Sequence, residues 1–454
     1  MSEVALANRE SLQAASALRA WYLVAVLTLF YALSFVDRQI MSLLVGPMKH
    51  EFALSDTRIG LLQGFAFASF YTLMGFPLGR FADTGDRRGL IAGGIVLWSA
   101  MTSLCGTAKS FFSLFLARMG VGVGEATLSP AAFSLISDSF SPGSLGVAFS
   151  VYSMGISIGS GVALLVGGSL VSSVLRMNAV SLPFLGTFSS WRLTFFAVGL
   201  PGLLFAPLIK TVKDPNRRNL MRASDGRPLN LGLAATFREF RRRWQSITGM
   251  SFAIVFQSVA SYAFFAWAPE YFQRVHGWTV AQAGHCLGAM VIFCCCSGTW
   301  VGGALCDYWV RKGMYEGPLR VGVLSAIGAG VLFAFALTAP QFRWSWEAMA
   351  PGLFFISLPG GSAYAALQLI LPNQVRGQIS AIFLFILNIG GLSLGPLLPA
   401  ILNDYVFKNE SMIGVSTALT MGLACTLVIA TLPRIYKPYR RDFLAMHSRP
   451  ELRG

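Results

Sequence analysis

Twelve stretches of mostly apolar residues, each long enough to cross a bilayer, are the feature that most constrains how this 454-residue chain folds. A transmembrane helix needs about 20 such residues, because hydrocarbon offers no partner for unpaired backbone groups. Only 12% of the residues are charged, whereas a soluble protein carries about 25%. The sequence therefore predicts an all-α membrane protein with twelve transmembrane helices. The expected spans are 20–46, 58–80, 89–108, 110–139, 144–172, 191–212, 246–274, 279–309, 319–339, 346–371, 376–403 and 411–432.

The basic residues indicate how the chain is oriented in the membrane. The formal net charge is +15, and most of the 35 Lys and Arg residues lie in the termini and the even-numbered loops. Cytoplasmic loops of membrane proteins carry this excess, so we expect both termini to be cytoplasmic. The short termini and compact loops suit a multi-pass protein of a bacterial inner membrane. Because topology explains the basic charge, we exclude nucleic-acid binding.

One long polar connection, residues 213–245, divides the expected helices into six plus six. It holds nine basic residues, namely Lys213, Arg217, Arg218, Arg222, Arg227, Arg238, Arg241, Arg242 and Arg243. Such a run beside a membrane indicates a cytoplasmic linker with affinity for anionic headgroups, and the basic tail is interpreted in the same way. The predicted organisation is an N-terminal segment 1–19, a bundle 20–212, the linker 213–245, a bundle 246–432 and a tail 433–454.

Residues that would bind a metal or catalyse a reaction are not evident in the sequence. The seven Cys residues, which include the run from Cys294 to Cys296, lack metal-ligand spacing, and we interpret them as packing residues. His276 and His285 fall near outer helix ends without a carboxylate at ligand spacing. We expect no metal, no cofactor and no enzymatic activity. A membrane-embedded lipid hydrolase or acyltransferase and a non-transporting sensor are the alternatives.

Two loops in corresponding positions of the halves share one pattern. Residues 79–88 and 303–312 both have the order Gly-x-apolar-x-Asp-x-x-x-Arg-basic. Repeated halves are how many transporters build a midplane site with alternating access. We expect the ion pairs of these loops to close the cytoplasmic side in an outward-facing state; the alternative is a static set of individually weak helix-end pairs. The expected gate residues are Gly79, Asp83, Arg87, Arg88, Asp138, Gly303, Asp307 and Arg311.

With the twelve expected helices, these loops resemble the major facilitator superfamily. The signature of that family, Gly-x-Leu-Ala-Asp-x-x-Gly-Arg-Arg, is similar to residues 79–88, in which Phe81 replaces Leu and Asp86 replaces the later Gly. The resemblance covers residues 20–435. It implies two six-helix bundles that rock around a central cavity, and it is the main reason for assigning a gating role to the loops.

Ionisable residues deep inside the expected helices are the most informative for function. A charge at the bilayer centre costs about 2.5–3.5 kcal/mol, so it usually faces a cavity or a partner. Asp37 and Arg38 lie in the first helix, and Arg118 and Glu125 lie in the fourth. Arg118 and Glu125 share a helix face about 10 Å apart, which leaves room for a group from the first helix.

We predict that these four residues form one network in which two carboxylates share two cations. Burial favours the neutral form of a carboxylate, and a nearby Arg favours the charged form. Asp37 and Glu125 are therefore the candidates for proton coupling, and Arg38 and Arg118 are their charge partners. The alternative is a permanently satisfied structural network. Glu270, which is near the outer end of the seventh helix, is instead expected to lie at a cavity mouth or the membrane interface.

The same residues sharpen the resemblance. Asp37-Arg38, the run Gly-Val-Gly-Glu-Ala at 122–126 and the run Leu-Ile-Ser-Asp at 135–138 resemble the Spinster subfamily. The resemblance implies transport of a lysophospholipid or sphingosine-1-phosphate, with proton coupling through Asp37 and Glu125 and headgroup binding by Arg38 and Arg118. Residues 155–161 only partly match the Gly-Pro motif of drug antiporters, which disfavours a multidrug exporter.

The second half has many aromatic residues in its expected helices but few polar ones. An amphiphile with a charged head and a long tail would suit this asymmetry, although any single Phe is as well explained by contact with lipid. The expected partners are an amphiphilic lipid substrate, protons and membrane lipids, and the protein is expected to be a monomer. A transporter of a small organic anion or hydrophilic metabolite is the alternative. The aromatic residues in question are Phe264, Phe265, Phe354, Phe355, Phe383 and Phe385.

Overall fold

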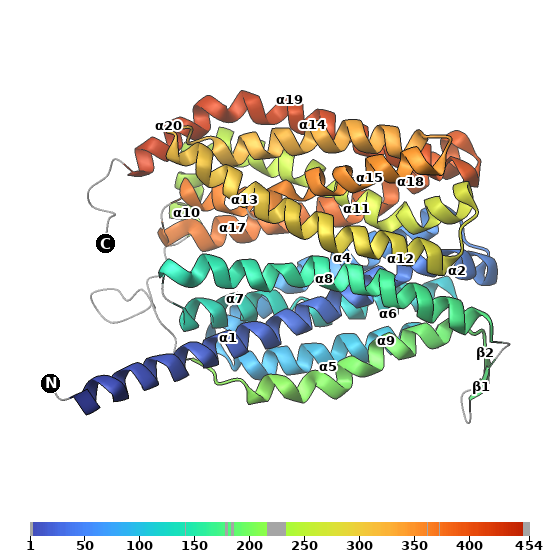
Figure 1. The fold of residues 1–454 in the computed structure, drawn as a ribbon, viewed down its shortest axis with the longest axis horizontal. Coiled ribbons are helices and arrows are strands. Elements are labelled where there is room, and N and C mark those ends of the chain that lie inside the picture. Colours follow the sequence, from blue (N-terminus) through green and yellow to red (C-terminus); the bar gives the residue numbers. More distant parts are fainter. Residues whose placement is uncertain are drawn as a thin grey trace. The chain divides into compact units, whose positions relative to one another are not determined.

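The computed structural model describes residues 3–140, 142–177, 180–182, 186–215, 233–360, 362–371 and 373–447, most of which are helical (Figure 1). Within these residues, eleven helices are long and apolar enough to cross a membrane. Each corresponds to one expected span. They are Ala17–Leu43, Asp56–Ala82, Arg87–Cys105, Phe111–Ser139, Val147–Leu175, Arg192–Thr211, Trp244–His276, Val280–Arg311, Gly317–Thr338, Ile382–Phe407 and Glu410–Met446.

The tenth expected span, 346–371, is divided into short pieces. Helix α15 ends at Ser357, a 3-10 turn covers Leu358–Gly360, and α16 follows over Ser362–Leu369. The Pro359-Gly360 pair explains the break, because Pro removes a backbone donor and Gly costs helical stability. Within the described residues, the tenth span is therefore not among the helices that are long and apolar enough to cross a membrane.

The described helices fall into two compact units. The first unit contains residues 1–38, 70–163 and 174–228, and the second contains 39–69, 164–173 and 229–454. Residues 39–69 and 164–173 precede the linker in sequence but pack with the second unit.

Within the described residues, the first unit contains seven α-helices and one small sheet. The elements, some of which extend past the unit's limits, are α1 (Glu3–Gln39), α4 (Ala66–Thr84), α5 (Arg87–Cys105), α6 (Phe111–Glu125), α7 (Leu128–Ser139), α8 (Pro142–Leu175), β1 (Val180–Leu182), β2 (Gly186–Phe188) and α9 (Arg192–Phe205). Strands β1 and β2 pair antiparallel, with Val180 opposite Phe188. This hairpin is not predicted from the sequence, because three-residue strands are too short to show an alternation of apolar and polar residues.

The second unit contains the remaining elements. They are α2 (Val45–Phe52), α3 (Asp56–Gly60), α10 (Leu233–Arg242), α11 (Trp244–His276), α12 (Val280–Met290), α13 (Cys296–Arg311), α14 (Gly317–Thr338), α15 (Phe342–Ser357), α16 (Ser362–Leu369), α17 (Asn373–Leu387), α18 (Ser393–Ile401), α19 (Ile413–Thr431) and α20 (Tyr436–His447). Short 3-10 or π-helical turns join several of them. The last expected span runs past residue 432 because α20 follows α19 almost without interruption.

The residue that departs from the family signature has a local structural reason. Asp86 precedes α5, and its Oδ1 accepts a hydrogen bond of 3.0 Å from the backbone N–H of Arg88. A short acidic side chain at this position satisfies one of the unpaired N–H groups at a helix start. Asp86 therefore fixes the beginning of α5 where the signature has Gly.

Helices α5 and α6 cross at backbone contact. A Cβ added at Gly94 would lie 2.7 Å from the Gly124 carbonyl oxygen, and one added at Gly124 would lie 2.6 Å from the Trp98 backbone nitrogen. Only Gly permits this approach, since even a methyl group overlaps the opposite backbone. The crossing lies next to Glu125, the last residue of α6, so it sets the position of that carboxylate.

We expect Gly94→Ala to destabilise the protein, because the added methyl group must displace α6. Overpacking of a dense interior costs about 1–3 kcal/mol. The neighbouring Gly93 is exposed, and a Cβ added there would meet nothing within 4 Å. Gly93→Ala is therefore a matched control, expected to stay within about 1 kcal/mol of wild type. Thermal unfolding in detergent measures the difference. Equal stability of the two variants would contradict the close crossing.

Candidate functional site

Arg38 and Glu125 form a buried ion pair within the first unit. The Nε and Nη2 atoms of Arg38, at the end of α1, lie 2.7 and 2.6 Å from Oε2 of Glu125. Glu125 is 2% exposed. It is also the last residue of α6, where the carbonyl end of the helix adds negative potential. Glu125 therefore needs a nearby cation if it is to be ionised at low electrostatic cost.

The second oxygen of Glu125 is not used by the protein. Oε1 is buried and has no hydrogen-bond donor among the residues that the structure describes. A buried polar atom without a partner costs about 1–3 kcal/mol. Oε1 is thus a place where a proton or a donor from a ligand would be stabilised.

Asp37, the residue before Arg38, points to a different helix. It is 3% exposed, and its Oδ2 accepts a hydrogen bond of 3.3 Å from Oγ1 of Thr102 on α5. It also interacts electrostatically with Glu125, Arg118 and Arg38. Thr102 is not predicted from the sequence as a partner of Asp37, because a single neutral Thr in an apolar helix carries no recognisable signal.

Arg118 completes the cluster from the middle of α6. It is 1% exposed and interacts electrostatically with Glu125, Asp37 and the thiol of Cys105. The structure therefore brings all four predicted residues into one electrostatic neighbourhood, with one direct ion pair between Arg38 and Glu125. Their roles in proton coupling and headgroup binding stay predictions.

Aromatic rings surround the guanidinium of Arg38. Its Cζ lies 4.7 Å from the ring centroid of Phe35 and 5.0 Å from that of Tyr71. Tyr31 stacks on Tyr152, with centroids 4.5 Å apart and planes 3° from parallel. Contacts of a cation with aromatic faces are worth about 0.5–2 kcal/mol. The rings of Phe35 and Tyr71 thus help to hold Arg38 beside Glu125 without competing for its charge.

The first loop motif forms a clamp around Arg87, which is buried. Its Nη1 donates to Ser134 Oγ at 3.0 Å and pairs with Asp138. Its Nη2 pairs with Asp214 at 2.5 Å and donates to the Pro215 carbonyl at 2.7 Å. The predicted Arg87–Asp138 contact is therefore present, whereas Asp214 and Pro215 were missed because they lie at the edge of the linker.

The other gate residues are placed differently. Arg88 donates through Nη1 to the Val212 carbonyl at 3.0 Å, and the side chain of Asp83 lies outside the described residues. In the second motif, Nε of Arg311 donates to the backbone carbonyl of Asp307 at 3.3 Å. Neither Gly79 nor Gly303 lies at a close contact: a Cβ at Gly79 would meet only Pro130, at 3.9 Å, and a Cβ at Gly303 would meet nothing within 4 Å. The gating role of these residues stays a prediction.

A second ionic network, in the second unit, was not foreseen. Its centre is Asp56, the first residue of α3, which is fully buried. Oδ1 of Asp56 lies 2.6 Å from Nζ of Lys49, and Oδ2 lies 2.8 Å from Nη1 of Arg274 on α11. Nδ2 of Asn403 donates to the same Oδ2 at 2.6 Å. One carboxylate thus joins three segments that are far apart in the sequence.

Further carboxylates extend this network. Glu270 pairs with Arg274 at 2.7 Å, and the exposed Glu410 pairs with Lys49 at 2.8 Å. Asp404 accepts from the backbone N–H groups of Asp56 and Thr57 at 3.2 and 2.6 Å, which caps the start of α3. Glu270 is therefore buried in an ion-pair network within the second unit. The i,i+4 spacing of Glu270 and Arg274 was the one sequence pattern that could have indicated an ion pair of this network. Asp56 and Lys49 lie in or beside a short predicted connection between helices, where charged residues are not unusual.

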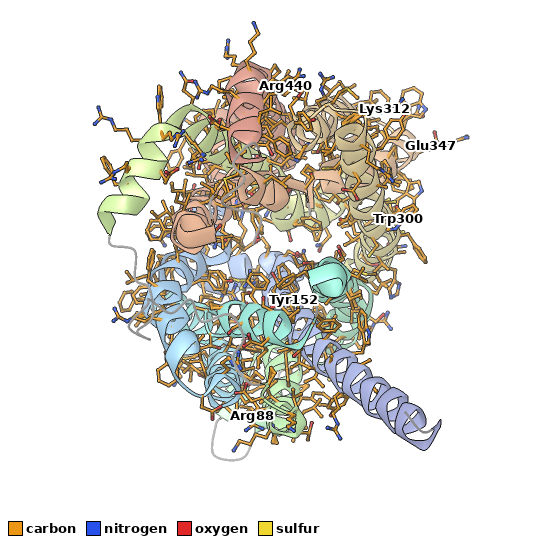
Figure 2. The ribbon with its side chains drawn as sticks, turned by 90° about the vertical axis from the view of Figure 1, so that its left-hand side faces the viewer. Arg88, Tyr152, Trp300, Lys312, Glu347 and Arg440 are labelled. Atoms are coloured by element: carbon orange, nitrogen blue, oxygen red, sulfur yellow. The ribbon has the colours of Figure 1, made fainter. Side chains whose placement is uncertain are left out.

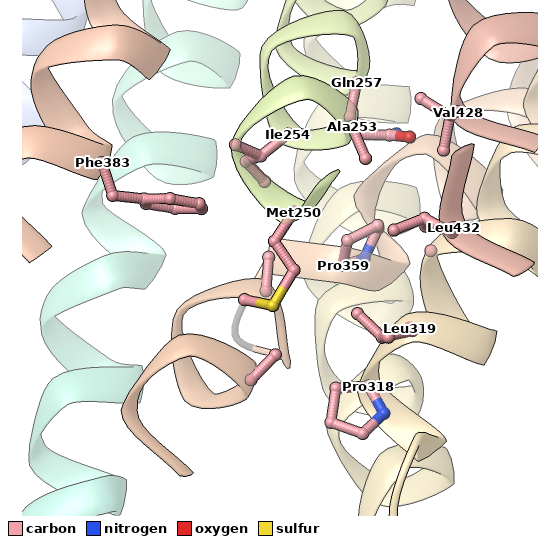
Figure 3. Close-up of a pocket in the computed structure, with 13 residues that line it drawn as sticks. Met250, Ala253, Ile254, Gln257, Pro318, Leu319, Pro359, Phe383, Val428 and Leu432 are labelled. Carbon is pink, nitrogen blue, oxygen red and sulfur yellow. The ribbon is translucent and has the colours of Figure 1, made fainter. Parts of the chain in front are cut away.

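The second unit also contains an apolar pocket, whose empty space of about 400 Å³ includes open solvent (Figure 3). Met250 and Ile254 of α11, Pro359 and Phe383 are among the residues that line it. The polar exception is Gln257, whose Nε2 donates to Ser325 Oγ at 3.1 Å, while Oε1 has no donor among the described residues.

The aromatic residues of the second half therefore differ in their surroundings. Phe383 lines the pocket, whereas Phe264 packs into the core against Phe333, with ring centroids 4.7 Å apart. Phe354 and Phe355 contact each other edge to face.

The two outer His residues contact hydroxyl groups. His276 Nε2 lies 3.1 Å from the Tyr271 hydroxyl, and His285 Nε2 lies 2.5 Å from Ser169 Oγ. Within the described part of the chain, no group of three or more His, Cys, Asp or Glu residues is arranged to hold a metal ion.

Comparison with known proteins gives the family. Residues 27–396 match the Major Facilitator Superfamily. An MFS-type efflux pump of Mycolicibacterium smegmatis is 29% identical over 444 residues, 94% of this chain and 95% of that protein. A probable L-galactonate transporter of Escherichia coli is 24% identical, over 79% of this chain and 78% of that protein.

A solved structure agrees with these matches. It is a bacterial homolog of the human lysosomal transporter Spinster, in an inward-facing and unoccupied conformation. This structure is similar with a TM-score of 0.74 and 26% identity, over 95% of this chain and 99% of that chain. The multi-pass fold, the loop motif at 79–88 and the charges of α1 and α6 all agree with this assignment. The chain belongs to the Major Facilitator Superfamily, and it is similar in structure to the bacterial Spinster homolog.

Proposed function

We propose that this protein is a proton-coupled transporter that moves a lysophospholipid or a sphingoid or lipid phosphate across a bacterial inner membrane by alternating access. The observation that carries the proposal is the buried Arg38–Glu125 ion pair beside Asp37 and Arg118. Two carboxylates and two cations in one buried cluster are balanced, so a proton or an anion that arrives there upsets the balance. Binding of a proton then favours binding of an anion, and binding of an anion favours binding of a proton.

Proton binding and headgroup binding would be linked through the same cation, Arg38. Protonation of Glu125 removes the charge that holds Arg38, whose guanidinium stays between Phe35 and Tyr71. A phosphate can then take the place of the carboxylate, because Arg binds either group through the same donors. Conversely, a phosphate that draws Arg38 away leaves Glu125 near Asp37 without its cation, which favours proton uptake. This exchange links transport to the proton gradient.

The apolar pocket supports an amphiphilic substrate. Its lining is apolar except for Gln257, so it would accept an alkyl tail but not a hydrophilic metabolite. Each methylene buried there would contribute about 0.8 kcal/mol. Taken by itself, the first unit offers charge to an anionic group, and the second unit, taken by itself, offers apolar surface to an alkyl chain.

Alternating access also requires that each side of the protein can close. The Asp56 network lies in the region that the predicted topology places outside the cell, and we assign it to closure of that side. The Arg87 clamp lies on the predicted cytoplasmic side, together with both termini. When the outer network breaks, Asp56, Lys49 and Arg274 become hydrated, which offsets the loss of their ion pairs.

A small organic anion is the second candidate substrate. The probable L-galactonate transporter of Escherichia coli matches most of this chain, and a sugar-acid carboxylate would pair with Arg38 as a phosphate does. The two candidates differ in the use of the apolar pocket, because a sugar acid has no tail to place there.

Glu125→Gln and Asp37→Asn are expected to abolish the pH dependence of transport, because neither amide can take up a proton. We expect proton-driven lysolipid flux into proteoliposomes to fall by at least about tenfold, which corresponds to about 1.4 kcal/mol. Glu347→Gln is the control, since Glu347 is an exposed carboxylate paired with Arg343, and it is expected to retain wild-type flux. An unchanged pH profile in both buried variants would refute the coupling assignment.

Asp56→Asn is expected to weaken the outer closure, because Lys49 and Arg274 lose their shared buried counterion. Removing one partner of a buried ion pair costs about 3–5 kcal/mol. Amide hydrogen exchange of residues 45–60, followed by mass spectrometry, should become faster. Glu410→Gln removes only the exposed partner of Lys49 and should change little. Equal exchange in Asp56→Asn and wild type would argue against a closing role.

Ile254→Trp is expected to shorten the preferred tail of the substrate, because the larger side chain fills the pocket. In wild type, each added methylene should tighten binding by up to about fourfold, as 0.8 kcal/mol implies. Phe252→Trp on the exposed face of α11 is the control. Binding is measured by thermal shift with lysolipids of graded chain length. If chain length has no influence in wild type, the organic-anion candidate is favoured instead.

A further inference from the structure

The C-terminal helix α20 is amphipathic and packs against the second unit through one face. Tyr439, Asp442 and Phe443 are buried on this face. Ser246, in the first turn of α11, donates to Asp442 Oδ2 at 2.6 Å. Phe443 stacks on Tyr315, with centroids 4.6 Å apart and planes 18° from parallel. The tail predicted from sequence as a basic extension is therefore, up to residue 447, an ordered helix.

One contact of α20 has a specific structural consequence. The hydroxyl of Tyr439 donates to the carbonyl of Ala366 at 3.0 Å. Ala366 is in the last turn of α16, where carbonyl groups have no partner inside the helix. Tyr439 therefore supplies a donor that caps α16. A contact of this kind helps to hold α16 in position within the second unit.

The opposite face of α20 and the turn before it carry cations. Four basic residues are exposed there, and one of them, Arg441, pairs with the buried Asp442, the only acidic residue of α20, at 3.2 Å. Leu444 is exposed beside them. Figure 2 shows Arg440 directed away from the body of the second unit. We define this surface as the basic face of α20, formed by Arg434, Lys437, Arg440 and Arg441.

We propose that the basic face of α20 binds anionic phospholipid headgroups of the membrane, and that this binding stabilises α16 through Tyr439. A helix with cations and an apolar residue on its free face is suited to the boundary between headgroups and acyl chains. Each cation near an anionic surface contributes about 1 kcal/mol, or about fivefold in affinity. An acidic protein partner would be attracted by the same charge but would not need the exposed Leu444.

The contacts of α20 connect this surface to the apolar pocket. Ala363 and Ala366 of α16 and Leu432, in the turn before α20, all line the pocket. Headgroup binding that holds α20 against α16 therefore also holds one wall of the pocket. The lipid composition of the membrane then regulates the second unit, whatever the substrate is.

The experiment compares nanodiscs of phosphatidylcholine alone with nanodiscs that also contain phosphatidylglycerol. The readout is amide hydrogen exchange of residues 436–447 and 362–369, which does not depend on transport. In wild type, phosphatidylglycerol should slow exchange in both segments, and added salt should reverse the effect because it screens the charges. Unchanged exchange in wild type would overturn the proposal.

Two variants separate the parts of the proposal. The triple variant Lys437→Gln, Arg440→Gln and Arg441→Gln should lose the response in both segments, whereas the control Arg176→Gln, Arg343→Gln and Lys408→Gln, which removes three exposed cations elsewhere, should keep it. Tyr439→Phe should keep the response of α20 and lose that of α16. A triple variant that responds like wild type would overturn the lipid site. A wild-type response of α16 in Tyr439→Phe would overturn the coupling through Tyr439.

Discussion

The pairing of Arg38 with Glu125 is the interaction on which the proposed mechanism depends. Both residues are inside helices that lipid surrounds, where an unpaired charge is costly. The pair is stable because each partner lowers the electrostatic cost of burying the other. It becomes unstable as soon as one partner is neutralised or attracted elsewhere. A buried ion pair is weak evidence for stability by itself. It is better evidence of a site that responds to a proton or an anion.

The surroundings of this pair keep the response local. The backbone crossing at Gly94 and Gly124 fixes the end of α6, and the rings of Phe35 and Tyr71 hold the guanidinium. Thr102 orients Asp37 from a third helix. These contacts position the members of the cluster relative to one another within the first unit.

The two units differ in the chemistry that they offer. The first unit concentrates buried charge between α1, α5 and α6, whereas the second unit combines an apolar pocket with the ionic network around Asp56. The second unit also contains α16 and the residue that donates to its last turn, Tyr439.

Local sequence predicted the approximate limits of the eleven membrane helices found in the described residues, because the length of an apolar stretch is a property of neighbouring residues. It also singled out Asp37, Arg38, Arg118 and Glu125, since any charge inside such a stretch is conspicuous. Tertiary structure alone decided which partners these charges meet and how the ends of the units are held. Asp56 and Asn403 are 347 residues apart in the sequence, and Arg87 and Asp214 are 127 apart. No local pattern encodes such pairs, because they exist only once the packing of distant helices brings their side chains within a hydrogen-bond length.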